Sequence, residues 1–271
     1  MPHDGSTRLV QLSHPDQGRR VALVYHDELH LLATYRSAYS FAVAALETGW
    51  KLRDLFSTDL SGIVLDYREV HALRTPWRFL PAFDDPVQPG RCLVSAVPAG
   101  GGWQYAGSGD CLRAHGDGVE IAPAPMRFPE IAAAYLMDFD SVPRRVGVAL
   151  GAGMAIGPEL ILETGMPRLE GSVAVLRGGK EVRRLGFCGG DVPLALALAA
   201  VEPDHFRHAG HRRAGDSHVH FFGARLFDPV KCPDLKEGDE LVVELAGFGQ
   251  RLCNRLTAAA SPEWRSAAVP L

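Results

Sequence analysis

The segment LKEGDELVVELAGFGQRLCNRL, residues 235–256, carries the pattern that decides the fold of this 271-residue chain. It contains a Gly-Asp pair, continues with alternating apolar and polar residues, and ends in a glycine-flanked Leu-x-Asn motif. Alternation is typical of a strand with one buried face, and Gly and Asp mark the turns at its ends. We therefore expect the chain to close with strands of a β-structure.

Similar patterns extend upstream as far as residue 91. Short apolar runs are separated by Gly, Pro and Asp, and GGDVPLALALAAVEP (189–203) is the one good candidate for a helix. Many short strands at close intervals favour a folded-over β-structure over alternating βαβ units. The clearest runs are EIAAAYLM (130–137), RRVGVAL (144–150) and GSVAVLRGGKEV (171–182).

The N-terminal part has a different pattern. RRVALVYHDELHLL (19–32) predicts two short strands around a turn, and SAYSFAVAALETGWKLRDLF (37–56) has apolar residues at helical spacing. Proline and aspartate crowd TPWRFLPAFDDPVQPGRC (75–92), which cannot be a continuous helix or a central strand. We therefore predict a small N-terminal α/β subdomain, residues 1–85, and a β-rich main domain, residues 86–271.

Composition and charge exclude several classes of protein. The net charge is −4, and no basic stripe for nucleic acid is present. No apolar run reaches the roughly 18 residues that suggest a membrane span, and the N-terminus has no signal-peptide pattern. The five cysteines fit neither a disulfide framework nor a zinc clip. We expect a cytoplasmic protein that binds neither nucleic acid nor membranes.

Several motifs, in order along the chain, resemble the fumarylacetoacetate hydrolase superfamily. The closing segment is similar to the superfamily's last strands, and RRAGDSHVHFFGA (212–224) is similar to its Gly-Asp strand leading to the substrate loop. The histidine form of that strand resembles the sugar-acid branch, which includes 2-keto-3-deoxy-acid dehydratases. The other motifs are WRFLPAFDDP (77–86), RCLVS (91–95), FPEIAAAYL (128–136) and AIGPEL (155–160).

The resemblance implies an α+β fold, in which a mixed β-roll follows the small N-terminal α/β subdomain, and a homodimer. Members use Mg2+ or a similar hard ion to bind the oxygens of a 2-oxo acid or 1,3-diketone. The metal stabilises the enolate that forms on dehydration, decarboxylation or C–C cleavage. Its usual ligands are the two glutamates of a Glu-x-Glu and an aspartate on a later strand, and a lysine and a lid histidine-glutamate pair assist.

This sequence departs from the family pattern at most of those positions. Phe128-Pro129-Glu130 stands where Glu-x-Glu is expected, so only the second glutamate remains. Residues 152–155, where the aspartate is expected, include no acid. The departures elsewhere are Ala106 for the lysine, AVPAGGGW (96–103) for the lid pair, and Ala224 for a threonine of the substrate loop.

One carboxylate is too few to hold Mg2+, so we expect a metal-independent protein without a cofactor. The alternative is a site for Mg2+ or Mn2+ made by Glu130 with Asp138 or Asp140. The two aspartates alternate and would share one face of a strand. They also fit a turn before Pro143, which is the interpretation we favour.

The segment HFRHAGHRRAGDSHVHFFGA holds five of the eleven histidines. On a strand, His218 and His220 share a face. They could form a pocket wall, act as a general base, or bind an ion such as Zn2+ with a third ligand. His205, His208 or His211 could supply that ligand only if the turn folds back. We favour the pocket wall, then the general base, and we place His205 and His211 on a solvated turn.

Two functional hypotheses follow. The favoured one is an enzyme, a lyase or C–C hydrolase that acts on a small 2-oxo acid or β-dicarbonyl compound through an enol(ate), without the family's Mg2+ site. The alternative is a catalytically degenerate relative that serves as a partner subunit or ligand-binding protein. In an apolar pocket with no metal, Glu130 should have a raised pKa. The predicted catalytic residues are Glu130, His220 and His218, and the predicted substrate-binding residues are Tyr105, Phe128, Gly223 and Ala224.

Overall fold

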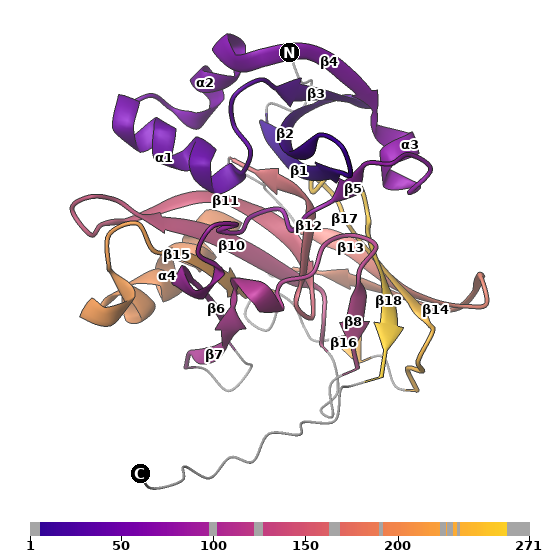
Figure 1. Cartoon of the computed structure of the whole chain (residues 1–271). Coiled ribbons are helices and arrows are strands. Elements are labelled where there is room, and N and C mark those ends of the chain that lie inside the picture. Colours follow the sequence, from indigo (N-terminus) through magenta and orange to yellow (C-terminus); the bar gives the residue numbers. More distant parts are fainter. Residues whose placement is uncertain are drawn as a thin grey trace, which may run out of the picture.

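The computed structural model describes residues 6–97, 102–121, 127–162, 169–189, 192–222, 226, 230–231 and 234–258 (Figure 1). Its larger sheet has eleven strands, of which β15 and β6 pair in parallel and β10 and β11 antiparallel, so the sheet is mixed as predicted. The spatial order is β4 (Leu60–Asp66), β3 (Glu28–Leu32), β2 (Gly18–Tyr25), β1 (Arg8–His14), β12 (Ala155–Ile161), β11 (Pro143–Ala152), β10 (Glu130–Met137), β15 (Ser217–Phe221), β6 (Cys92–Ala96) and β7 (Gln104–Ser108), with β5 (Arg78–Phe79) paired to β1.

The closing segment forms the hairpin that its sequence predicts. Its strands β17 (Glu240–Leu245) and β18 (Leu252–Thr257) pair antiparallel, with Leu241 opposite Asn254. Gly247 and Gly249 in the connecting turn have φ angles of 82° and 79°, a region that glycine adopts most readily. The hairpin belongs to a second sheet, whose other strands are β14 (Lys180–Cys188), β13 (Glu170–Arg177) and β8 (Gly118–Glu120). A third, two-stranded sheet pairs β16 (Val230–Lys231) with β9 (Arg127–Phe128).

The asparagine of the Leu-x-Asn motif joins this hairpin to a neighbouring turn. Asn254 is buried, and its Nδ2 donates to the carbonyl oxygens of Ala114 at 2.8 Å and Asp117 at 3.0 Å. Ala114 is buried, and leaving its carbonyl unpaired would cost free energy comparable to a lost hydrogen bond, whereas Asp117 is exposed. The motif thus fixes the turn at residues 114–117 against β18.

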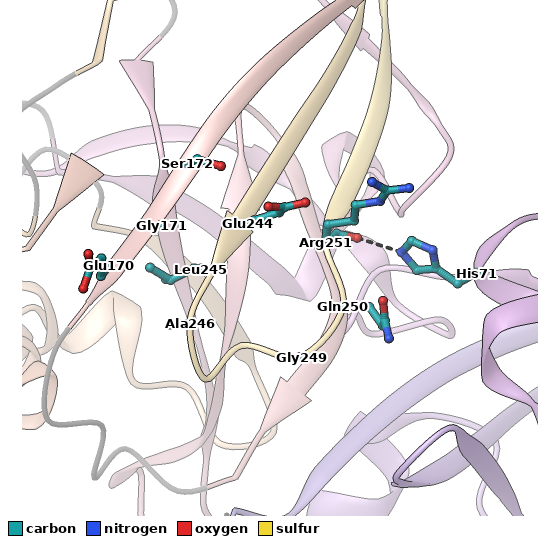
Figure 2. Close-up of a pocket in the computed structure, with 10 residues that line it drawn as sticks. All are labelled: His71, Glu170, Gly171, Ser172, Glu244, Leu245, Ala246, Gly249, Gln250 and Arg251. Carbon is teal, nitrogen blue, oxygen red and sulfur yellow. Dashed lines mark hydrogen bonds between the residues drawn. The ribbon is translucent and has the colours of Figure 1, made fainter. Parts of the chain in front are cut away.

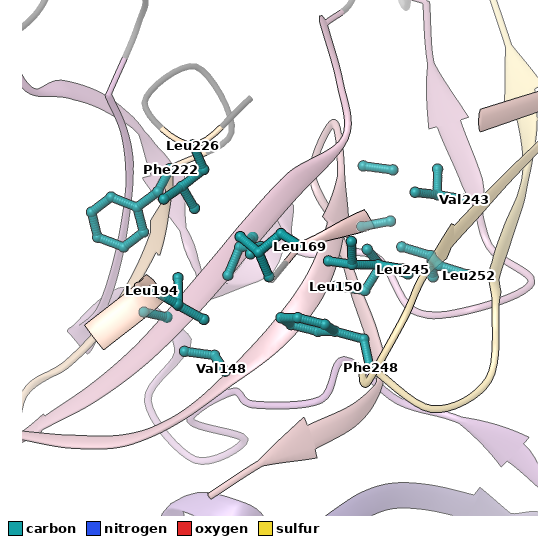
Figure 3. Packing of buried hydrophobic residues seen from close by; sticks show 14 of the residues in the cluster. Val148, Leu150, Leu169, Leu194, Phe222, Leu226, Val243, Leu245, Phe248 and Leu252 are labelled. Carbon is teal, nitrogen blue, oxygen red and sulfur yellow. The ribbon is translucent and has the colours of Figure 1, made fainter. Parts of the chain in front are cut away.

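The central sheet is covered by apolar groups on both faces. On β10, Ile131, Ala133 and Tyr135 join one hydrophobic cluster, and the alternate residues Ala132 and Ala134 join another. Figure 3 shows the first cluster, in which side chains of β11, β17 and the helix α4 (Leu194–Phe206) meet. The second cluster packs under α1 (Ala38–Thr48) and α2 (Leu52–Asp59). This alternation decides which side chains can meet.

The N-terminal part keeps most of its predicted elements. The two strands expected within residues 19–32 are β2 and β3, but the helix expected over residues 37–56 is divided into α1 and α2. The division follows Gly49, which ends α1 with a φ of 70°. After β4 comes the short helix α3 (Tyr67–His71). Because β1 pairs with β12, the sheet continues past the boundary predicted near residue 85, and the division into two domains stays a prediction.

The proline-rich segment is irregular, as predicted, and it is held by a buried glutamine. Gln11 on β1 donates from Nε2 to the Pro81 carbonyl at 2.6 Å and to the Asp84 carboxylate at 2.8 Å. Its Oε1 accepts from the backbone N–H of Ala38, the first residue of α1, at 2.7 Å. One side chain therefore joins the sheet, the helix and the irregular segment. None of the described helices is long and apolar enough to cross a bilayer.

Candidate functional site

Glu130 is the first residue of β10, as predicted, and it lies opposite Gly151 of β11. A Cβ atom added to Gly151 would lie 3.1 Å from the ring of Phe221 and 3.3 Å from the Cβ of Glu130. The missing side chain at Gly151 therefore leaves room for both groups. Glu130 and Phe221 share the face of the sheet that carries Ala132 and Ala134.

The carboxyl group of Glu130 is surrounded by protein atoms although the residue keeps part of its surface exposed. Desolvation raises its pKa from 4.5 to about 8, and none of the described residues supplies a cation that counteracts this rise. The rise predicted from the sequence is confirmed. At neutral pH the protonated form predominates, so Glu130 can donate a hydrogen bond or a proton.

Among the described residues, Glu130 is not grouped with the further oxygen ligands that the Mg2+ ion implied by the family resemblance would need. A hard ion of this kind needs several oxygen ligands. Within the described ranges, Glu130 belongs to no group of three potential metal ligands. The segment where the aspartate is expected is a two-residue turn, Gly153-Met154, joining β11 directly to β12.

The alternative metal site with Asp138 or Asp140 is not assembled either. These aspartates follow the far end of β10, roughly 25 Å from Glu130 at the usual rise per strand residue. Asp138 forms a turn, since its Oδ1 accepts from the backbone N–H groups of Asp140 at 3.0 Å and Val142 at 2.8 Å. Arg144 donates to its other oxygen at 2.7 Å. The favoured interpretation of these residues as turn-forming is confirmed.

His218 and His220 share one face of β15, as predicted, but this is not the face of Glu130. His220 lies opposite Ala133 of β10, whereas Phe221 lies opposite Ala132. Because side chains alternate along a strand, Phe221 is the residue on the side of Glu130. The predicted partnership of Glu130 with His220 or His218 across a pocket is therefore not formed, and their catalytic roles stay predictions.

The chain before β15 folds back and brings a third histidine to the pair. His205 lies in the last turn of α4, is 2 % exposed, and its Nε2 lies 3.2 Å from Nδ1 of His218. The placement of His205 on a solvated turn is wrong. His211, which is partly buried, stacks on the His205 ring at 4.3 Å and donates from Nδ1 to the His205 carbonyl at 3.0 Å.

Aromatic rings enclose the three buried histidines, which we call the histidine cluster (His205, His218 and His220). Trp103 contacts His205 and His220 edge-to-face at centroid distances of 4.5 and 4.6 Å. Tyr135 and Phe206 contact His220 at 5.1 and 5.6 Å. Trp103 has no predicted role, because nothing near it in the sequence links it to the histidines.

Burial keeps the histidine cluster neutral. Desolvation and the neighbouring imidazoles lower the pKa of His205 to about 3 and that of His218 to about 4, and they hold the pKa of His220 well below its usual range. The backbone of His211 raises the pKa of His218 and so offsets part of this lowering, although it does not form a well-aligned hydrogen bond with His218 Nε2. Four ring nitrogens lack hydrogen-bond partners among the described residues: His205 Nδ1, His218 Nε2, and both of His220.

Unpaired buried nitrogens are costly. A buried polar group without a partner destabilises a protein by about 1–3 kcal/mol, and nearly all such groups in native proteins are paired. Neutral imidazoles with free lone pairs are also the form that binds metal ions. The histidine cluster can therefore bind a cation. Without one, its unpaired nitrogens destabilise the folded protein.

The predicted substrate-binding residues are spread more widely. Tyr105 lies on the edge strand β7 and is 68 % exposed. Phe128 belongs to β9, but its side chain lies outside what the structure describes, as do Gly223 and Ala224. Their roles stay predictions.

An open hollow of about 580 Å³ lies on the second sheet beside α3 (Figure 2). Glu170 and Glu244 line one part of it, and His71 donates from Nε2 to the Arg251 carbonyl at 2.8 Å in another. His71 and Arg251 also line a neighbouring hollow of about 480 Å³. None of the predicted site residues lines either hollow.

Comparisons with known proteins bear on the fold. No family model matches the sequence, and no curated protein matches it significantly. The structure is similar to 2-keto-3-deoxyarabinonate dehydratase with a TM-score of 0.65 and 12 % identity, over 94 % of this chain and 100 % of that one.

Two further solved structures agree with this similarity. A 2-keto-3-deoxy-D-arabinonate dehydratase complexed with magnesium and 2,5-dioxopentanoate matches with a TM-score of 0.60 and 11 % identity, over 94 % of this chain and 100 % of that one. Maleylpyruvate hydrolase from Sphingobium sp. SYK-6 matches with a TM-score of 0.55 and 12 % identity, over 92 % and 100 % of the two chains. The chain therefore has the fold of the fumarylacetoacetate hydrolase superfamily, which its ordered sequence motifs predict.

Proposed function

We propose that the protein is an enzyme that acts on a small 2-oxo acid or β-dicarbonyl compound through an enol, as a lyase or C–C hydrolase, with Glu130 as its general acid. The observation that carries this proposal is the desolvated carboxyl of Glu130, whose pKa of about 8 keeps it protonated at neutral pH. A catalytic acid works best when its pKa lies near the working pH. The fold similarity to a dehydratase and a hydrolase of such acids supports the substrate class.

The chemistry asked of Glu130 is the transfer of one proton. When a bond next to a carbonyl breaks, negative charge develops on the carbonyl oxygen, and a neutral carboxylic acid can donate to that oxygen. The Phe221 ring on the same face provides an apolar wall, which strengthens this hydrogen bond by excluding water. His218 and His220 have no part in this step, since they face the other side of the sheet.

We further propose that this reaction does not depend on Mg2+. Glu130 has no second carboxylate in a ligand group within the described residues, and a two-residue turn stands where an aspartate is expected. In this proposal the protonated carboxyl neutralises the enolate that a metal would otherwise stabilise. The similar dehydratase was solved in complex with magnesium, so a reaction without Mg2+ would distinguish this protein from it.

The test is a screen of purified protein on 2-keto-3-deoxy acids and acylpyruvates, with and without EDTA. We expect turnover that EDTA leaves unchanged and that Glu130→Gln lowers by roughly 100-fold or more, the scale of general acid–base groups. Glu47→Gln, at an exposed position of α1, is the matched control and should keep full activity. Turnover that requires added Mg2+, or an unimpaired Glu130→Gln, would contradict the proposal.

A screen without turnover is also informative. If the compounds bind, as measured by calorimetry, but are not converted, the protein is a ligand-binding relative without catalysis. That result would reject the enzyme and support the alternative hypothesis.

A further inference from the structure

We propose that the histidine cluster binds one Zn2+ ion, or a similar borderline divalent cation, on the face of the central sheet opposite Glu130. Each of the three histidines offers one ring nitrogen, and these three atoms lie within 4.8 Å of one another. The proposed site is separate from the proposed role of Glu130, so either can fail without the other.

The spacing of one nitrogen pair matches the geometry of a tetrahedral zinc site, and the third nitrogen lies within 4.8 Å of both. With Zn–N bonds of about 2.0–2.1 Å in a tetrahedron, two ligand nitrogens lie about 3.3 Å apart. His205 Nε2 and His218 Nδ1 lie 3.2 Å apart. In the absence of an ion, this pair can share only one proton in a hydrogen bond, and His220 then has no partner in the described part of the chain.

The surroundings of the cluster support a cation rather than a protein partner. All three histidines are buried, with His218 and His220 fully so. The hydroxyl of Tyr135, whose ring contacts His220, donates instead to Glu202 at 2.7 Å. A metal ion would bind one nitrogen on each ring at once, and it would give His220 the partner that this residue lacks among the described residues.

The ligand chemistry selects the class of ion. Imidazole suits Zn2+ and its neighbours Co2+ and Ni2+, whereas Mg2+ prefers oxygen ligands. Three imidazoles fill three of the four positions of zinc and leave the fourth for a small ligand such as water. The ion would join the C-terminal turn of α4 to β15, two elements whose ligand residues are separated by a loop.

A second group of potential ligands, His71, His115 and Cys253, provides an internal comparison. His115 Nε2 donates to the His71 carbonyl at 3.0 Å, and His115 Nδ1 accepts from the Cys253 backbone N–H at 3.2 Å. Both ring nitrogens of His115 therefore have protein partners. The ring nitrogens of His115 are thus hydrogen-bonded without an ion, whereas ring nitrogens of the histidine cluster have no partner among the described residues.

The test uses the full chain after treatment with a chelator. Titration with Zn2+ in a calorimeter should show about one ion bound per chain and a raised Tm, whereas Mg2+ should leave the Tm unchanged. His220→Gln should weaken Zn2+ binding by more than about 100-fold, beyond the loss typical of removing a group that only orients a ligand. His115→Gln is the matched control and should bind as the wild type does.

Two results would overturn the proposal: wild-type protein that takes up no Zn2+, or binding that His115→Gln abolishes and His220→Gln does not. If His220→Gln fails to fold, X-ray absorption of the zinc-loaded wild type decides. Three nitrogen ligands at about 2.0–2.1 Å support the histidine cluster, and a sulfur ligand at about 2.3 Å assigns the ion to Cys253 and refutes it.

Discussion

Replacing Glu130 by glutamine should change the pH dependence of stability. The folded-state pKa of about 8 lies above the ordinary value of 4.5, so folding favours the protonated carboxyl. This group costs the fold nothing below its unfolded pKa, and the cost grows as the pH rises toward the folded pKa. Glutamine is neutral at every pH and removes that dependence.

The size of the effect follows from the two pKa values. Linkage gives a cost of about 1 kcal/mol at pH 5 and about 3 kcal/mol at pH 7, rising to at most about 5 kcal/mol above pH 8. These are upper limits, because the residue is partly exposed and water screens the ionised form. Relative to the wild type, Glu130→Gln should therefore gain up to about 2 kcal/mol between pH 5 and pH 7.

The assay is urea denaturation of both proteins at a series of pH values, with the difference in unfolding free energy plotted against pH. Glu47→Gln on the exposed surface of α1 serves as the control and should shift stability by less than about 0.5 kcal/mol throughout. Stability curves for wild type and Glu130→Gln that stay parallel from pH 5 to pH 8 would show an ordinary, solvated carboxyl. The proposed general acid would then be lost as well.

Three further substitutions test the buried hydrogen bonds. Gln11→Leu leaves the N–H of Ala38 and the carbonyl of Pro81 without their partner, whereas Asp84 keeps its ion pair with Arg19, so chemical denaturation should show a loss of about 2–3 kcal/mol. Asn254→Ala removes two hydrogen bonds to the turn before β8 and should lower the unfolding free energy by about 2–3 kcal/mol in the same assay. An unchanged denaturation midpoint would show that Asn254 does not hold this turn in place. Burial raises the pKa of Glu159, and the 2.5 Å hydrogen bond from Tyr67 opposes that rise. Tyr67→Phe removes this bond, so its destabilisation of about 1–3 kcal/mol should be larger at pH 8 than at pH 5, and a loss that decreases with pH would contradict this assignment.

Local patterns in the sequence predicted local structure well. Alternation placed His218 and His220 on one face of a strand, because side-chain direction in a strand depends only on neighbouring residues, and the apolar run over residues 130–137 placed Glu130 at the start of another strand. The raised pKa of Glu130 also followed, since it requires only that the carboxyl be desolvated.

Relations between distant segments could not be predicted in this way. Whether Glu130 faces a histidine depends on the register between β10 and β15, and a shift of one residue would reverse the answer. The burial of His205 depends on α4 continuing past Pro203, where the predicted helix ended. That extra turn carries His205 to His218.

The two-residue turn between β11 and β12 limits how this protein could be redesigned. Gly153 adopts a φ of 62° there, and the strands pair up to Ala152 and Ala155 on either side. An aspartate or glutamate substituted at one of residues 152–155 would alter the hairpin, but it would not lengthen the connection between the two strands. Under the proposed chemistry without Mg2+, converting the protein to a magnesium-dependent form calls for an insertion that lengthens this connection, together with a glutamate at position 128, rather than for a single exchange.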